Sequence, residues 1–186
     1  MKPVKRIVLI SALAATIFAA QVGLAFIPNV ELVTLLFLLV ALHLKPVDAF
    51  LVSVVFAVLE ALVWGLGDWV IGYLWIWPLW MSICVLFKKI NGVNPDRWAL
   101  LGGLFGLIFG FLFSLQHAVP YGVTMGIAYW IRGISFDIVH GISNYILILI
   151  CLVPMHRAFT TLMRRWEGKN GRHDENRGPR DNGGIR

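Results

Sequence analysis

Long apolar runs, separated by short polar and turn-forming stretches, fill the first 166 positions of the chain. A membrane-spanning helix needs roughly 20 mostly apolar residues in succession, and these runs have about that length. Together with the turn signals between them, the runs predict six transmembrane helices. We place the helices at residues 7–26, from a cap at Asn29 to 44, and at 47–64, 71–87, 98–115 and 133–157, with an amphipathic continuation to 166.

Two segments differ from this pattern. Residues 123–131 are semi-apolar but too short to span, so we expect an interfacial or partly re-entrant piece there, with a short seventh element as the alternative. Residues 167–186 are rich in Gly, Arg, Asn and Asp, a composition typical of disorder. The sequence thus predicts an all-α membrane protein, with a six-transmembrane-helix bundle over residues 1–166 and a disordered cytoplasmic tail at 167–186.

The basic residues, which give a formal charge of +6, indicate orientation. With six spans drawn, every Lys and Arg except Arg132 falls on the side of the two termini. Positively charged loops stay in the cytoplasm, so both termini are predicted to be cytoplasmic. The same distribution favours contact with anionic membrane lipid and argues against nucleic acid. The apolar run at 7–26 exceeds the roughly 7–15 residues of a signal-peptide core, so a retained first helix is expected.

Three polar side chains, Asp137, His140 and Asn144, interrupt the apolar sixth helix. At positions i, i+3 and i+7 they share one arc of the helix with Gly133 and Gly141. Ionisable groups at membrane depth are costly and typically face a bundle interior or a cavity. The stripe therefore predicts a binding site, with a helix-packing hydrogen bond as the alternative for any single residue.

Aromatic residues crowd the stretch 64–80, where Asp68 stands beside Trp69 and is followed by Tyr73 and Trp77. An interfacial belt of Trp and Tyr explains part of this crowding. Aromatic walls with a few polar groups are also what a small-molecule pocket needs, and both interpretations stay open. Polar residues gather in the outer halves of the predicted helices, which favours a site reached from outside. They are Asn29, Glu31, Glu60, Asp68, Gln116, His117, Arg132, Asp137, His140 and Asn144.

Small residues repeat every four positions in two helices. They are Ser11, Ala15, Ala19 and Gly23 in the first helix, and Gly102, Gly106, Gly110 and Ser114 in the fifth. Such stripes let transmembrane backbones approach closely, either inside one chain or between chains. For each stripe taken alone, packing inside the chain is the more frequent explanation.

Sequence motifs give catalysis little support. The chain has no Gly-x-Ser-x-Gly, His-Glu-x-x-His, paired-cysteine or Walker A pattern. Among His117, His140, Asp137 and Glu60, only Asp137 and His140 have a metal-ligand spacing. We therefore expect no metal, no cofactor and no enzymatic activity, and any uphill transport has to draw on an ion gradient or a partner.

Three segments resemble the substrate-binding (S) components of energy-coupling factor (ECF) vitamin transporters. They are Ala15-Thr-Ile-Phe-Ala19, Phe26-Ile-Pro-Asn-Val-Glu-Leu-Val-Thr34, and residues 133–144 followed by Pro154. The resemblance covers about residues 5–160. It implies a six-helix bundle in a prokaryotic plasma membrane that captures a vitamin or related micronutrient on its outer face. Such a component docks through its first helix onto a membrane coupling subunit, which two cytoplasmic ATPase subunits drive.

By this resemblance, Ser11, Ala15 and Ala19 would contact the coupling subunit. With the aromatic wall included, the predicted substrate-binding residues are Asp68, Trp69, Tyr73, Trp77, His117, Asp137, His140 and Asn144. Lys2 stands where cobalt and nickel members keep a histidine, so a transition-metal substrate is not expected. One Arg among several acids favours a neutral or weakly charged heterocycle. The rival hypotheses are a self-sufficient secondary transporter or channel, and a small membrane enzyme that uses Asp137 and His140 as an acid/base pair.

Overall fold

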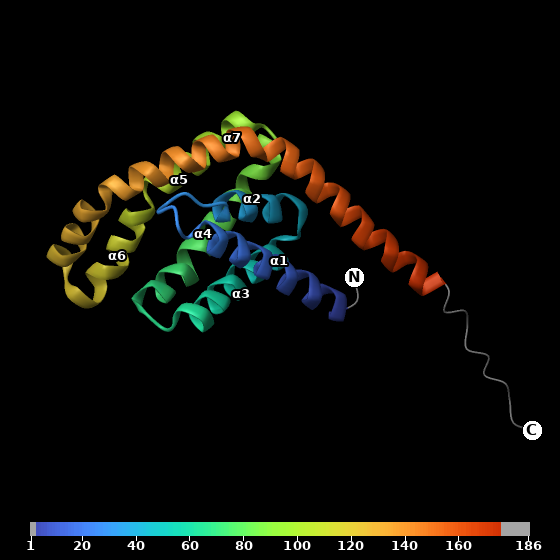
Figure 1. Ribbon diagram of the computed structural model, residues 1–186, viewed down its shortest axis with the longest axis horizontal. Coiled ribbons are helices and arrows are strands. Elements are labelled where there is room, and N and C mark those ends of the chain that lie inside the picture. Colours follow the sequence, from blue (N-terminus) through green and yellow to red (C-terminus); the bar gives the residue numbers. More distant parts are fainter. Residues whose placement is uncertain (1–2, 176–186) are drawn as a thin grey trace, which may run out of the picture.

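Figure 1 shows a computed structural model of the chain, which describes residues 3–175, with side chains through residue 168. Helices are the only regular elements in this described part. In chain order they are α1 (Pro3–Leu24), α2 (Val33–His43), α3 (Pro46–Trp64), α4 (Asp68–Asn91), α5 (Pro95–Leu107), α6 (Phe109–Tyr121) and α7 (Val123–Glu175).

Five helical segments are long and apolar enough to cross a membrane. They are α1, α3, α4, the α5–α6 pair over Pro95–Tyr121, and α7 over Val123–Gly168. The chain is therefore a multi-pass membrane protein, and the prediction of an all-α membrane bundle is confirmed. Six spanning helices and the side on which each terminus lies stay predictions, because α2 has only 11 residues.

The short helix α2 lies at the centre of the bundle. It is apolar on all sides, and eight of its 11 residues are buried. A helix that is hydrophobic all round is typical of a fully surrounded position, and α2 packs against α1, α3, α4 and α7. Figure 1 shows it enclosed by these elements. Its central position explains how a helix shorter than a membrane span belongs to an otherwise spanning bundle.

The first turn of α2 differs from the sequence expectation. Asn29 was predicted to cap this helix, but it adopts a φ of 58° in the preceding turn and the cap position falls on Leu32. The Glu31 carboxylate instead accepts hydrogen bonds from the backbone N–H groups of Val33 and Thr34. The prediction of the cap is wrong because a carboxylate at the helix start satisfies two free N–H groups and suits the helix dipole.

Two boundaries in the second half of the chain also differ. The predicted single helix at 98–115 is interrupted at Ile108, which separates α5 from α6. The predicted interfacial segment at 123–131 is instead the first part of α7, which follows a turn at Gly122 with φ +87°. In Figure 1, α7 arches along α5 and α6, and its last part projects beyond the other helices. It continues to Glu175, past the predicted boundary at 166, and residues 176–186 of the predicted tail lie outside the described residues.

The small residues of α5 serve packing inside the chain. A Cβ added to Gly106 would lie 2.8 Å from the carbonyl oxygen of His140 and 2.9 Å from the Cα of Gly141. A Cβ on Gly102 would collide with the side chain of Ile148, and a Cβ on Gly141 would collide with that of Leu107. The backbones of α5 and α7 therefore touch, which is the close approach that small residues permit in membrane helices.

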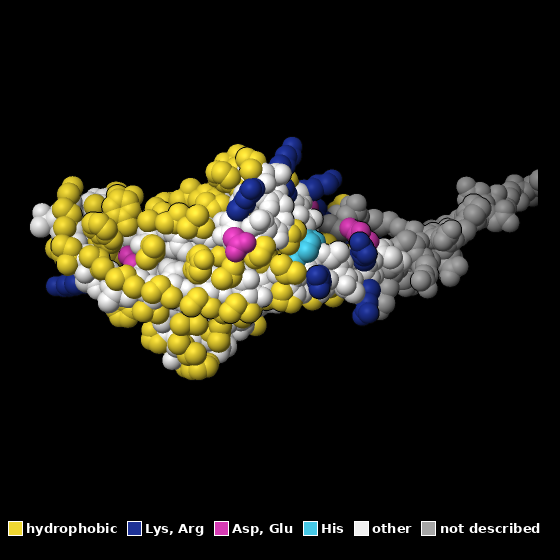
Figure 2. Space-filling view, turned by 90° about the horizontal axis from the view of Figure 1, so that it is seen from above, with side chains coloured by type: hydrophobic (Ala, Val, Ile, Leu, Met, Phe, Trp, Pro, Cys, Tyr) yellow, Lys and Arg dark blue, Asp and Glu magenta, His cyan; other side chains and the backbone are white. Residues whose placement is uncertain are grey.

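The two ends of the bundle differ in chemistry. At one end, which we call the basic end, Arg6 pairs with Asp48, and the Lys88 ammonium donates to the carbonyls of Ala41 and Leu44. The opposite end, called the distal end, carries the α1–α2 loop and the turns at 65–67 and 122. On the face shown in Figure 2, most basic side chains lie in the right half of the described part, and the left half is largely hydrophobic.

The contact between α5 and α7 leads to a stability prediction. Gly106→Ala should lower the free energy of unfolding by about 1–3 kcal/mol, because the added methyl group meets rigid backbone and overpacks the interface. Gly23→Ala is the matched control, since a Cβ there has no neighbour within 4 Å. Thermal unfolding of the purified protein in detergent measures both. An unchanged midpoint for Gly106→Ala would contradict the close helix contact.

Candidate functional site

Three adjoining hollows at the distal end share one side chain, Tyr73 of α4, and we call them the Tyr73 cavities. The inner cavity, of about 190 Å³, lies between the α1–α2 loop, α4 and α7. The α3 cavity, of about 310 Å³, lies between α1, α3 and α4. The α7 cavity, of about 680 Å³, lies between α4, α6 and α7. The α3 and α7 cavities fall within the roughly 300–1,000 Å³ typical of small-molecule sites, and the inner cavity is smaller.

The common wall of the cavities is an aromatic face of α4. Trp69, Tyr73 and Trp77 are spaced four residues apart, so they lie on one side of the helix. Their rings meet edge to face, with centroids 5.3 Å apart for Trp69 and Tyr73 and 5.7 Å apart for Tyr73 and Trp77. Trp77 is 2% exposed, whereas Trp64 is 58% exposed. This face of α4 therefore forms the buried wall of the cavities, and Trp64 lies exposed at the rim of the α3 cavity.

A polar network crosses the inner cavity from α2 to α7. Besides capping α2, the Glu31 carboxylate accepts a 2.6 Å hydrogen bond from the Thr34 hydroxyl and lies 3.2 Å from His140 Nε2. The Thr34 hydroxyl in turn accepts a 3.2 Å bond from the Asn144 side-chain amide. Thr34, His140 and Asn144 are all buried. Their bonds therefore join α7 to the start of α2 inside the protein.

Asp137 connects the break between α5 and α6 to the α7 cavity. Because α6 starts at Phe109, its first N–H groups lack helical partners, and the N–H of Gly110 donates a 2.8 Å bond to Asp137 Oδ1. The close approach needs a glycine, since a Cβ on Gly110 would collide with this carboxylate. Asp137 is only 7% exposed, and its Oδ2 has no hydrogen-bond partner in residues 3–168. One oxygen of Asp137 is thus fixed, and the other is free beside a cavity.

A second buried carboxylate belongs to Glu60 of α3, which lines the α3 cavity. The residue is 2% exposed, and its Oε1 is unpaired within the described side chains. Gln21 of α1 lies across the same cavity and donates a 3.4 Å bond to the Tyr73 hydroxyl. Gln21 also lines the inner cavity, so one α1 side chain bridges two of the hollows.

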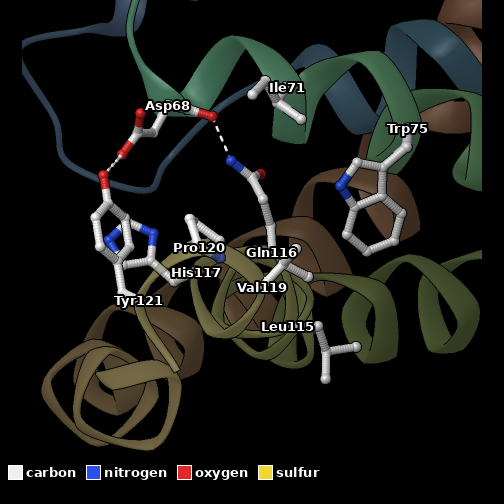
Figure 3. Close-up of a pocket in the computed structure, with 9 residues that line it drawn as sticks. All are labelled: Asp68, Ile71, Trp75, Leu115, Gln116, His117, Val119, Pro120 and Tyr121. Carbon is white, nitrogen blue, oxygen red and sulfur yellow. Dashed lines mark hydrogen bonds between the residues drawn. The ribbon is translucent and has the colours of Figure 1, made fainter. Parts of the chain in front are cut away.

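A fourth cavity, of about 500 Å³, lies between α4 and α6 and is shown in Figure 3. There the Tyr121 hydroxyl donates a 2.8 Å bond to the Asp68 carboxylate, and the Gln116 amide donates to the Asp68 carbonyl. Most of the other lining is apolar and aliphatic, and Tyr73 does not take part. His117 lines both this cavity and the α7 cavity, with its ring 4.5 Å from that of Tyr129.

The structure brings most of the predicted site together. Six predicted residues line the Tyr73 cavities: Trp69, Tyr73, Trp77, His117, Asp137 and His140. Asp68 lies at the separate α4–α6 cavity, exposed to the surface. Asn144 lines none of these cavities and makes the helix-packing bond that was its alternative role. The predicted interface residues Ser11, Ala15 and Ala19 are all exposed on α1.

Five polar residues that line the Tyr73 cavities stand outside the predicted substrate-binding set. Four of them belong to the polar set of the outer half, namely Asn29, Glu31, Glu60 and Arg132. For Glu60 the sequence left open a pocket role or a bond to a neighbouring helix. Gln21 was passed over, although an amide inside an apolar helix is such a signal too.

Comparison with known proteins gave no further identification. No family model matches the chain, and no curated protein or solved structure matches it. Among the residues that the structure describes, no three His, Cys, Asp or Glu side chains gather closely enough to hold a metal ion. We therefore infer function from the geometry of the cavities.

The Glu31 network leads to a second stability prediction. Thr34→Val should lower the free energy of unfolding by about 1–3 kcal/mol, because it orphans the Asn144 amide and removes a donor from Glu31. Thr34→Ser, which keeps the hydroxyl, should recover most of this loss. Thr16→Val is the control, since the Thr16 hydroxyl is exposed and bonds only within α1. Denaturant unfolding in detergent micelles measures all three, and equal stability of Thr34→Val and wild type would rule out the network.

Proposed function

We propose that the chain is the substrate-binding S component of an ECF-type importer in a prokaryotic plasma membrane. In this proposal a vitamin or related heterocyclic micronutrient binds in the Tyr73 cavities, which face outward. The observation that carries the proposal is the position of these cavities. They combine an aromatic wall with buried, partly unpaired polar groups, and they lie at the end of the bundle opposite the basic residues.

The apolar layer beneath the cavities supports binding rather than conduction. Phe37, Trp80 and Phe105 are at most 2% exposed, and the Trp80 and Phe105 rings stack with centroids 4.7 Å apart. The Trp80 indole N–H is itself satisfied by the Thr34 carbonyl at 3.0 Å. A channel or proton relay needs polar groups along its path, and this layer offers a packed apolar floor instead.

The surface of α1 supports a role as one subunit of a larger importer. The chain has no Walker A sequence, so an ATPase partner would have to supply the energy. Ser11, Ala15 and Ala19 form an exposed stripe of small side chains on α1, whereas the glycine stripe of α5 is covered by α7. An uncovered small-residue face permits close approach by a helix of another subunit. We propose this face as the contact with the coupling subunit.

The enzyme alternative receives less support from the same geometry. Asp137 is bonded to Gly110 and lines the α7 cavity, whereas His140 faces Glu31 in the inner cavity. An acid/base pair has to reach one reacting group together. The different partners and cavities of the two residues favour binding roles for both.

The proposal predicts that a small heterocyclic metabolite accompanies the purified chain. Mass spectrometry of molecules released from protein in mild detergent should find one at near-stoichiometric amount. Tyr73→Ala should lower its retention at least about tenfold, because this ring contacts all three cavities. Trp130→Ala, which removes an aromatic ring outside these cavities, should retain the metabolite.

A matched uptake assay completes this test. Cells should accumulate the released metabolite only when the chain is expressed together with a coupling subunit and its ATPases. Uptake by the chain alone that collapses with the ion gradient would replace this proposal by the secondary-transporter hypothesis.

The α1 stripe leads to a separate expectation. Ala15→Leu combined with Ala19→Leu should abolish co-purification with the coupling subunit, because the larger side chains prevent close helix approach, and should leave ligand binding intact. Ser135→Leu, an exposed small-to-large change on α7, is the control and should still co-purify. Assembly of the double variant at wild-type yield would show that α1 is not the docking face.

A further inference from the structure

We propose that the Tyr73 cavities select a ligand with a cationic N–H group, such as an amine, an amidine or a protonated ring nitrogen, and that this group binds Asp137. The inference rests on the proposed function and names the chemical class of its substrate. It goes beyond the neutral or weakly charged heterocycle expected from the sequence.

The free oxygen of Asp137 is the main observation. Asp137 Oδ1 accepts the N–H of Gly110 at the N-terminus of α6, where the helix dipole favours a negative charge. Asp137 Oδ2 is buried beside the α7 cavity and has no donor among the side chains and backbone of residues 3–168. Leaving such an acceptor unpaired is costly, and a charged N–H donor is its strongest partner. The carboxylate is therefore held in place with one position ready for a ligand.

The walls of the α7 cavity suit the same positive charge. Trp69, Tyr73 and Tyr129 line it together with three phenylalanines, Phe109, Phe113 and Phe136. The face of an aromatic ring carries a negative partial charge and attracts an ammonium or amidinium group. Asp137 and the rings thus act on a cation in the same direction.

The neighbouring cavities repeat this preference for donors. Four buried polar atoms around Tyr73 are unpaired in the described structure: Gln21 Oε1, Glu60 Oε1, Asp137 Oδ2 and Trp77 Nε1. Three of these are acceptors and only the indole N–H is a donor. A ligand that satisfies them has to bring mainly N–H or O–H groups.

Basic side chains near the cavities do not reverse this preference. Arg132 lines the α7 cavity but is exposed, so solvent and salt screen its charge. His140 is buried, but it faces the Glu31 carboxylate at 3.2 Å. At the α7 cavity, the buried charge that is open to a ligand is therefore the carboxylate of Asp137.

The experiment compares ligands of matched shape and different charge on the full chain in detergent. Isothermal titration is carried out with three pairs: benzamidine and benzamide, benzylamine and benzyl alcohol, and phenylguanidine and phenylurea. In at least one pair the cation should bind at least about tenfold more tightly than its neutral partner. Asp137→Asn should remove this preference, because the amide keeps the shape and loses the charge. Asp96→Asn, which changes an exposed carboxylate at the start of α5, should preserve it.

Each outcome decides the inference. If no cation binds more tightly than its neutral partner, including the case in which none of the six molecules binds, the cation assignment is wrong. If the preference survives Asp137→Asn in a correctly folded variant, another group makes the selection and the role of Asp137 is wrong. Should that variant not fold, the wild-type pairs alone decide the ligand class. A neutral metabolite released from the protein would overturn this inference and leave the S-component proposal standing. Transport without ATPases would overturn the S-component proposal and leave the cation-binding role of Asp137 standing.

Discussion

Every polar group inside a membrane bundle has to find its partner within the chain, because lipid offers none, and this constraint orders the whole distal half. The Glu31 carboxylate satisfies the start of α2 and is met by Thr34 and His140. Asp137 satisfies the start of α6 in the same manner. In each case a carboxylate close to a helix start links that start to α7. Glu60 and Asp137 each keep one unpaired carboxylate oxygen, and both residues line the Tyr73 cavities.

Packing divides the bundle into two parts with different tasks. Below the cavities, aromatic rings of α2, α4 and α5 fill the interior, and the short α2 is enclosed on all sides. Around the cavities, α6 separates from the line of α5 at Ile108. The glycines of α5 hold α7 close up to this point, and beyond it α6 and α7 border a hollow of about 680 Å³ with α4. Tight contact with α5 and a cavity bordered by α6 thus follow each other along α7.

Much of this arrangement could be predicted from the sequence, because hydrophobic length places α1, α3 and α4, and helical spacing puts Asp137, His140 and Asn144 on one face. Depth along that face could not be predicted, so Asn144 was grouped with a cavity it does not line. The break between α5 and α6 at Ile108 lies in an apolar run without Pro or a polar residue, so no local signal predicts it. Residues 123–131 contain no helix-ending residue before Gly133, and they run on into α7 as one helix. The residue preference of helix caps predicted Asn29 at the start of α2. The path of the loop instead places the Glu31 carboxylate where it accepts the free N–H groups of α2. The pairing of Gln21 with Tyr73 depends on the approach of α1 to α4, which no local pattern specifies.

The most direct test of the central claim is an experimentally determined structure of the protein with the small molecule that accompanies it through purification. We expect that molecule to lie against the ring of Tyr73, with a donor group at Asp137 Oδ2. Density for it in the α4–α6 cavity beside Asp68, or at the basic end near Arg6 and Asp48, would contradict the assignment of the site.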